Sequence, residues 1–168
     1  MQEKHCLKVT HPTSQPHVPI MNEFIRFIDI KKLTRLPAAM TFTANSAEKE
    51  ALARRLGLVV LNTLEIECTI QGALGHYPLL VSAIIKADVM QSCVLTLKDL
   101  PSIVEEPVKL ALFLSDTDSA FLTESFEEDQ PEPVVLNKDG TLEIGEILVQ
   151  YLSLALDPYP KFDTDPLL

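Results

Sequence analysis

The fold is decided by residues 60–89, which read VLNTLEIECTIQGALGHYPLLVSAIIKADV. Apolar and polar residues alternate through residues 60–71 and again through residues 79–89, and this period of two is typical of half-buried antiparallel strands. The core faces expected from the alternation consist of Val60, Leu64, Ile66, Cys68 and Ile70 in the first strand and Leu79, Val81, Ala83, Ile85, Ala87 and Val89 in the second. Gly72 and Gly75 permit the turn between them, so the sequence predicts a long β-hairpin with one buried face.

Upstream of the hairpin, the sequence predicts two shorter strands and a helix. Residues 24–30, FIRFIDI, alternate as a strand does, and residues 38–44 form a second strand candidate. Asn45 or Ser46 can cap a helix that follows, because a short polar side chain accepts hydrogen bonds from the first free N–H groups. Gly57 is the expected end of that helix.

Downstream, we expect the return strand to continue through Cys93 and Leu95 and to be followed by a turn at residues 99–102. A further alternating strand then runs to Leu114, and its Pro107 predicts an edge or a bulge. After it we expect a short strand at residues 134–136, a turn at residues 137–140 and an amphipathic helix over residues 145–155. The predicted class is α+β: an antiparallel sheet or partial barrel of about five to seven strands, packed by one or two helices.

The domain organisation is simple. The 168 residues are enough for one domain with a substantial core. We expect a disordered tail over residues 1–20, a single domain over residues 21–161 and a short tail over residues 162–168. The apolar runs are too short to span a bilayer, and the first residues lack the apolar core of a signal peptide, so a cytoplasmic protein that binds no membrane is expected.

Charge is distributed unevenly along the chain. The net charge is −10, yet residues 1–60 hold nine basic and five acidic residues, which leaves five basic and nineteen acidic residues for positions 61–168. Residues 115–133 contain only acidic charges, at Asp116, Asp118, Glu124, Glu127, Glu128, Asp129 and Glu132. This acidic loop is either a solvated connection or a docking segment for a basic partner.

The basic residues of the first third are the candidates for contact with RNA. They are Arg26, Lys31, Lys32, Arg35, Arg54 and Arg55. Arg54 and Arg55 also have a simpler interpretation, since they fall in the last turn of the predicted helix and complement its dipole. The negative net charge opposes non-specific binding to nucleic acid, so we favour protein over RNA as the main contact and expect no binding to DNA.

The chain offers little for catalysis or for cofactor binding. Its five glycines are too scattered for a phosphate-binding loop, and its three cysteines include no CxxC pair. Cys68 and Cys93 are expected to be small buried apolar residues before any reactive role. His76 has no nucleophile or acidic partner at a known spacing and is interpreted as a turn residue. We therefore predict no cofactor, no metal site, no catalytic residues and no enzymatic activity.

Three segments together resemble the YceD family, also called the large ribosomal RNA subunit accumulation protein family, in its alphaproteobacterial branch. The segments are LARRLGL at residues 52–58, VMQSCVLTL at residues 89–97, and GTLEIGEI at residues 140–147 with the closing LALDPYP at residues 154–160. The chain departs from the family at two positions. Thr96 stands where many relatives have the second cysteine of CxxC, and Glu143 stands where an aspartate commonly caps the last helix.

The resemblance implies a role in making or keeping large-subunit ribosomal RNA. We therefore expect a non-enzymatic factor in ribosome biogenesis that supports 23S ribosomal RNA processing or accumulation. Its expected partner is a ribosomal protein or a processing factor of the large subunit, with ribosomal RNA as a further candidate. The alternative is a small-molecule-binding or hydrolytic domain that uses the interior or the open edge of the sheet, with no ligand indicated by the sequence.

Overall fold

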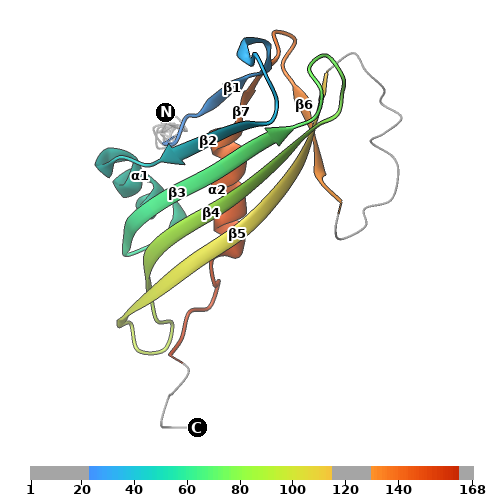
Figure 1. Cartoon of the computed structure of the whole chain (residues 1–168). Coiled ribbons are helices and arrows are strands. Elements are labelled where there is room, and N and C mark those ends of the chain that lie inside the picture. Colours follow the sequence, from blue (N-terminus) through green and yellow to red (C-terminus); the bar gives the residue numbers. More distant parts are fainter. Residues whose placement is uncertain (1–22, 115–129, 163–168) are drawn as a thin grey trace, which may run out of the picture.

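The hairpin predicted from residues 60–89 forms the centre of the fold. The structure, a computed structural model, describes residues 23–114 and 130–162 (Figure 1). Strand β3 (Val60–Gln71) pairs antiparallel with β4 (Leu79–Ser92), and β4 pairs antiparallel with β5 (Asp99–Leu114). These three long strands make one strongly curved sheet.

Two shorter strands complete that sheet. Strand β2 (Ala38–Thr43) lies antiparallel to β3 at one side, and β6 (Glu132–Leu136) lies beside the end of β5 at the other, which gives the order β2-β3-β4-β5-β6. A separate two-stranded sheet joins β1 (Phe27–Asp29) to β7 (Thr141–Glu143). The predicted α+β class is confirmed, with an open sheet rather than a closed barrel.

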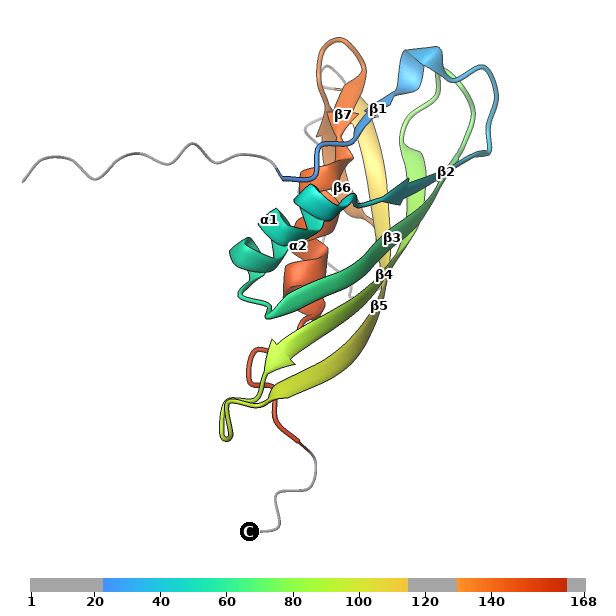
Figure 2. The same ribbon diagram turned by 90° about the vertical axis from the view of Figure 1, so that its left-hand side faces the viewer.

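Both helices cover the same face of the sheet, as Figure 2 shows. Helix α1 (Ser46–Leu56) has Asn45 as its N-cap and ends at Gly57, which adopts a φ of +68° that glycine tolerates. Helix α2 (Ile144–Ala155) is the predicted closing helix. A short 3-10 helix, η1 (Ile30–Lys32), connects β1 towards β2. No helix within residues 23–114 and 130–162 is long and apolar enough to cross a bilayer.

The core lies between the helices and the inner face of the sheet. All six residues predicted for the core face of the second hairpin strand are buried, as are four of the five predicted for the first. The exception is Val60, which is 43% exposed, while Leu61 is buried in its place. The cause is a register shift between Leu61 and Thr63, since a bulge exchanges the two faces of a strand.

Several boundaries differ from the prediction. The turn expected at residues 99–102 lies instead around residues 94–96, so β5 already begins at Asp99. Cys93 is buried just beyond the end of β4, but Leu95 is 60% exposed and belongs to no strand. Strand β1 is shorter than the seven residues predicted, because residues 24–26 precede it and the chain enters η1 at Ile30.

Two features of topology were not predicted. Strand β6 runs parallel to β5, although an antiparallel sheet was expected, and β7 lies between the turn predicted at residues 137–140 and the helix predicted from residue 145, where no strand was predicted. Both follow from the position of the chain after residue 130, which returns alongside β5 before it turns into β7 and α2.

The start of α2 is held by backbone groups rather than by a side-chain cap. Glu143, which stands where an aspartate commonly caps this helix in the YceD family, makes no capping hydrogen bond with its side chain. The carbonyl of Arg26 accepts hydrogen bonds from the N–H groups of Ile144 and Gly145, at 2.9 and 3.3 Å. A Cβ atom at Gly145 would lie 2.0 Å from the carbonyl oxygen of Phe24, so only glycine permits this close approach.

Candidate functional site

Arg26, the first candidate for RNA contact, is committed to an internal ion pair. Its guanidinium binds both carboxylate oxygens of Glu48, at 2.9 and 3.0 Å, and lies 4.0 Å from the centre of the Phe24 ring. It also donates to the carbonyl of Thr43 at the end of β2, at 2.7 Å. The bound guanidinium lowers the pKa of Glu48, which in turn accepts a hydrogen bond from the N–H of Asn45.

Arg55 is likewise occupied, by carboxylates from two other segments. It forms a two-pronged pair with Glu146 of α2, in which one N–O distance is 2.8 Å, and it lies 3.2 Å from Glu23. These carboxylates raise the pKa of Arg55 further above its already high value, and the guanidinium lowers the pKa of Glu146. Arg55 therefore ties α1 to α2 and to the segment that precedes β1.

The remaining basic candidates fall at two separate places. Lys31 and Lys32 belong to η1, which is followed by Arg35 and then by β2, whereas Arg54 lies at the far end of α1, which follows β2. A strand of six residues separates the two places by roughly 20 Å. Lys32 pairs with Asp29 at 3.1 Å, but its side chain is 84% exposed and the pair contributes little. The six candidates thus do not form one basic surface.

The acidic loop lies almost entirely outside the described residues, and so do the candidate partner-binding residues within it. These are Asp116, Asp118, Glu124, Glu127, Glu128 and Asp129. Its last acidic residue, Glu132, is the first residue of β6 and accepts a hydrogen bond from the hydroxyl of Tyr151 on α2. Burial, with the neighbouring Glu132, raises the pKa of Tyr151 to about 12.

The outer face of the sheet carries a ladder of charged residues across β3, β4 and β5. Glu65 lies opposite Lys86, and Lys86 lies opposite Glu105, while the Lys86 ammonium contacts Glu67 at 2.9 Å. The surrounding carboxylates raise the pKa of Lys86. With three carboxylates around one ammonium group, this part of the outer face is acidic.

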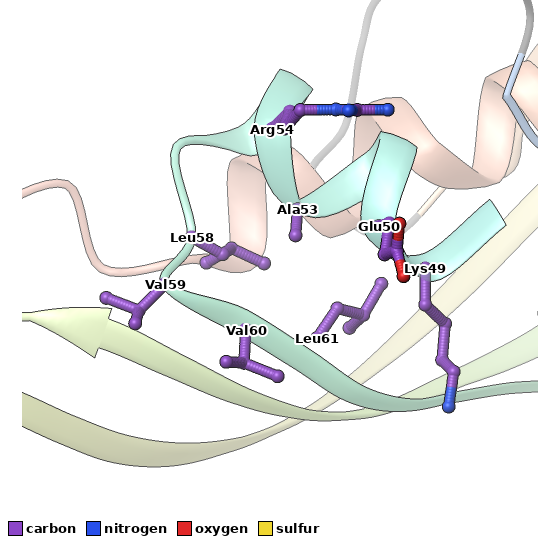
Figure 3. Close-up of a pocket in the computed structure, with 8 residues that line it drawn as sticks. All are labelled: Lys49, Glu50, Ala53, Arg54, Leu58, Val59, Val60 and Leu61. Atoms are coloured by element: carbon purple, nitrogen blue, oxygen red, sulfur yellow. The ribbon is translucent and has the colours of Figure 1, made fainter. Parts of the chain in front are cut away.

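A hollow of about 300 Å³ lies between α1 and the start of β3 (Figure 3). Its floor is apolar, and its charged groups are Lys49, Glu50 and Arg54, all from α1. The Lys49 ammonium donates to the carbonyl of Asn62 at 2.8 Å. The hollow is at the small end of the range for ligand sites and has neither a cysteine nor a histidine in its lining.

The two described cysteines are buried, as predicted, but their surroundings differ. Burial in the core raises the pKa of the Cys68 thiol to about 11. The Cys93 thiol is hydrogen-bonded to the hydroxyl and backbone of Thr96, and these contacts lower its pKa to about 7. The sequence signal for this difference is the residue at position 96, which can donate to a thiolate.

His76 is exposed in the turn between β3 and β4, where its backbone N–H donates to the carbonyl of Ala73 at 3.0 Å. Among the residues that the structure describes, no three histidine, cysteine, aspartate or glutamate side chains gather so that they could hold a metal ion.

A comparison of the chain with known proteins finds no matching family model, no matching curated protein and no matching solved structure. The likeness to the YceD family therefore depends on the segments of sequence quoted above.

Proposed function

We propose that this chain is a non-enzymatic factor in ribosome biogenesis that supports 23S ribosomal RNA processing or accumulation through protein contacts in the cytoplasm. The pathway is suggested by the resemblance to the YceD family. The mode of action is argued from charge. A partner of this kind is a basic ribosomal protein or a processing factor of the large subunit, because opposite potentials accelerate association and disfavour wrong partners.

One observation supports protein over RNA as the main contact. Arg26 and Arg55 are held in part-buried ion pairs with carboxylates of the same chain, and Lys32 makes a weaker, exposed pair with Asp29. The other three lie apart, with Lys31 and Arg35 before β2 and Arg54 in the last turn of α1, so a phosphate backbone would meet few of these charges at one time. Binding to RNA through phosphates requires several such contacts, since each one contributes to affinity by releasing counterions.

The test compares two sets of variants in cells from which the protein has been depleted. Replacing Glu127, Glu128 and Asp129 by glutamine or asparagine removes three charges from the acidic loop. The RNA set reverses Arg35 and Arg54, which avoids the structural pair at Arg55. We expect the acidic variant to lose capture of large-subunit proteins and to lower the level of 23S ribosomal RNA, and the arginine variant to behave nearly as the wild type.

Capture is repeated after ribonuclease treatment, which separates protein-mediated from RNA-mediated association. The proposal fails if depletion leaves large-subunit ribosomal RNA unchanged. Its protein-first mechanism fails if the acidic variant is normal while the arginine variant abolishes function.

A further inference from the structure

Strand β2 is an edge strand that lacks the usual protection. Its six residues, Ala38–Thr43, read AAMTFT and include no charged residue and no proline. Edge strands of natural proteins are commonly protected by such residues, because an exposed row of N–H and C=O groups pairs readily with another chain. We refer to the outward backbone of Ala39–Thr43 as the β2 edge.

The direction of the β2 backbone groups can be fixed from two hydrogen bonds. The N–H of Ala44 donates to the carbonyl of Leu64, so Ala44 faces β3. The carbonyl of Thr43 accepts instead from Arg26, on the side away from β3. Because successive residues of a strand alternate, Ala39 and Thr41 also direct both N–H and C=O away from β3. Within the described part of the chain, β2 pairs with no strand except β3.

The opposite edge of the sheet, along β5, is protected. Strand β6 covers only Leu110–Leu114 of β5, which leaves Asp99–Lys109 without a neighbour among the described strands. The carbonyl of Lys98 accepts from Cys93 and so faces β4, which places the odd-numbered residues of β5 outward. Pro101 and Pro107 are two of them, and neither has an N–H to offer.

The two faces beside the β2 edge indicate what kind of strand would fit there. On the inner face Met40 and Phe42 are only half-buried, so an added strand would cover them with its own apolar side chains. On the outer face Thr41 and Thr43 lie opposite Glu67 and Glu65 of β3. Since the outward side chains of β2 are small, a long basic side chain on an added strand can extend over them towards these carboxylates.

We propose that β2 binds an extended segment of a basic protein, which adds to the sheet as a further strand and alternates apolar residues with lysine or arginine. Main-chain hydrogen bonds from Ala39 and Thr41 supply the pairing, Met40 and Phe42 contact the apolar side chains, and Glu65 and Glu67 attract the basic ones. The identification of the partner as a basic protein rests on the proposed function, whereas the edge itself does not.

The experiment uses the full chain and a synthetic peptide in which valine alternates with lysine over the length of β2. Two further peptides of the same composition carry N-methyl groups on alternate residues, in one phase or in the other. Only one phase blocks the N–H groups that face β2, so we expect one methylated peptide to bind and the other to lose at least about tenfold in affinity. Purely electrostatic binding would treat both alike and would overturn the proposal.

Protein variants locate the binding site. Thr41→Pro removes an outward N–H from the β2 edge without breaking the ladder to β3, and the matched control Ile103→Pro makes the same change on β5, where the side chain is 84% exposed. We expect Thr41→Pro to weaken peptide binding at least about tenfold and Ile103→Pro to leave it unchanged. If Thr41→Pro does not fold, Thr41→Lys and Thr41→Glu keep the ladder and should weaken and strengthen binding respectively.

Equal effects of the two proline variants would overturn the proposal, and so would equal affinities of Thr41→Lys and Thr41→Glu. The outcome is separate from that of the proposed function. A peptide that binds the β2 edge of a protein whose depletion leaves 23S ribosomal RNA intact would refute the function and keep the edge. Loss of ribosomal RNA on depletion, together with unchanged peptide binding in Thr41→Pro, would support the function and refute the role of the β2 edge.

Discussion

The main sheet exposes backbone N–H and C=O groups along two edges, one formed by β5 and one by β2, and these two edges are protected in different ways. On β5, Pro101 and Pro107 remove two outward N–H groups, and β6 covers the last residues of the strand. On β2, the protection among the described residues is a single side chain, Arg26, which binds the carbonyl of Thr43. The β5 edge is therefore protected by its own sequence, and the β2 edge is only partly protected, by a residue from elsewhere in the chain.

This difference matters because it leaves the β2 edge, and not the β5 edge, able to pair with a strand of another protein. A proline in a strand cannot be moved aside, so the β5 edge stays closed to a partner. The β2 edge depends on the segment that precedes β1, since Arg26 belongs to it. That segment lies against the first turn of α2, where Gly145 allows contact with the backbone of Phe24.

The largest expected effect is that of Gly145→Ala, which would displace this segment. The new Cβ atom would lie 2.0 Å from the carbonyl oxygen of Phe24 and 2.9 Å from the N–H nitrogen of Arg26, so the backbone must move. We expect a loss of about 3 kcal/mol or more in the free energy of unfolding, measured by chemical denaturation. The matched control is Gly57→Ala, where the left-handed backbone conformation costs about 1 kcal/mol and no atom lies within 4 Å. Equal losses in the two variants would contradict the close contact.

The second effect is that of Arg26→Met, which keeps the apolar stem and removes the charge. Glu48 would lose its bidentate partner at a site where its side chain is only 18% exposed, and the carbonyl of Thr43 would lose the hydrogen bond from Arg26. We expect a loss of about 1–3 kcal/mol in the free energy of unfolding. The control Lys32→Met removes an exposed pair and should cost less than about 0.5 kcal/mol.

The same pair predicts a dependence on pH. The pKa of Glu48 is lowered from 4.5 in the folded state, so its contribution to stability is present above pH 4.5 and is lost as the pH falls through the folded value. The difference in stability between the wild type and Arg26→Met should therefore shrink below pH 4.5. A difference that stays constant from pH 7 to pH 3, roughly the range over which carboxylates titrate, would show that Arg26 acts mainly by packing.

Much of the sheet could be predicted because its signals are local. The alternation in β3 and β4 depends only on which side chains face the core, and the Asn45 cap and the Gly57 stop of α1 depend on a few neighbouring residues. The turn between β4 and β5 was misplaced, because Pro101 lies inside the strand on the outward side, where a proline is tolerated. The bulge that exposes Val60 leaves no clear mark in the sequence.

The candidate sites could be predicted less well because they depend on contacts between distant segments. Nothing in the sequence near Arg26 or Arg55 marks their carboxylate partners Glu48 and Glu146, which are 22 and 91 residues away. The β2 edge was missed for a related reason: an uncharged six-residue strand looks the same whether it lies at the edge or in the middle of a sheet. Only the order of strands shows that its second edge has no neighbour among the strands of residues 23–114 and 130–162.

A smaller effect is expected from Pro107→Val, which would open part of the β5 edge. The variant gains an outward N–H group, so the β5 edge should become more similar to the β2 edge in its ability to pair with an added strand. We expect a change of under about 1 kcal/mol in stability and a second, weaker site for the alternating valine–lysine peptide. Titration calorimetry would report the stoichiometry. A single site in Pro107→Val, with an affinity equal to that of the wild type, would mean that the prolines do not keep the β5 edge closed.

The smallest effect concerns the turn between β4 and β5. Here the backbone N–H of Cys93 donates to the carbonyl of Lys98, and the carbonyl of Cys93 accepts from the N–H of Leu97. The pKa of Cys93 is lowered to about 7, against 9.0 for an ordinary thiol, so its contribution to stability is present above pH 9.0 and declines as the pH falls towards 7. The free energy of unfolding should therefore rise between pH 7 and pH 9. This rise should disappear in Cys93→Ser and become smaller in Thr96→Val, which keeps the backbone hydrogen bonds to the thiol. Cys68 cannot produce it, because its pKa is raised to about 11 and its effect begins only above pH 9.0, with the opposite sign. A rise that is undiminished in Thr96→Val would show that the hydroxyl of Thr96 does not stabilise the thiolate.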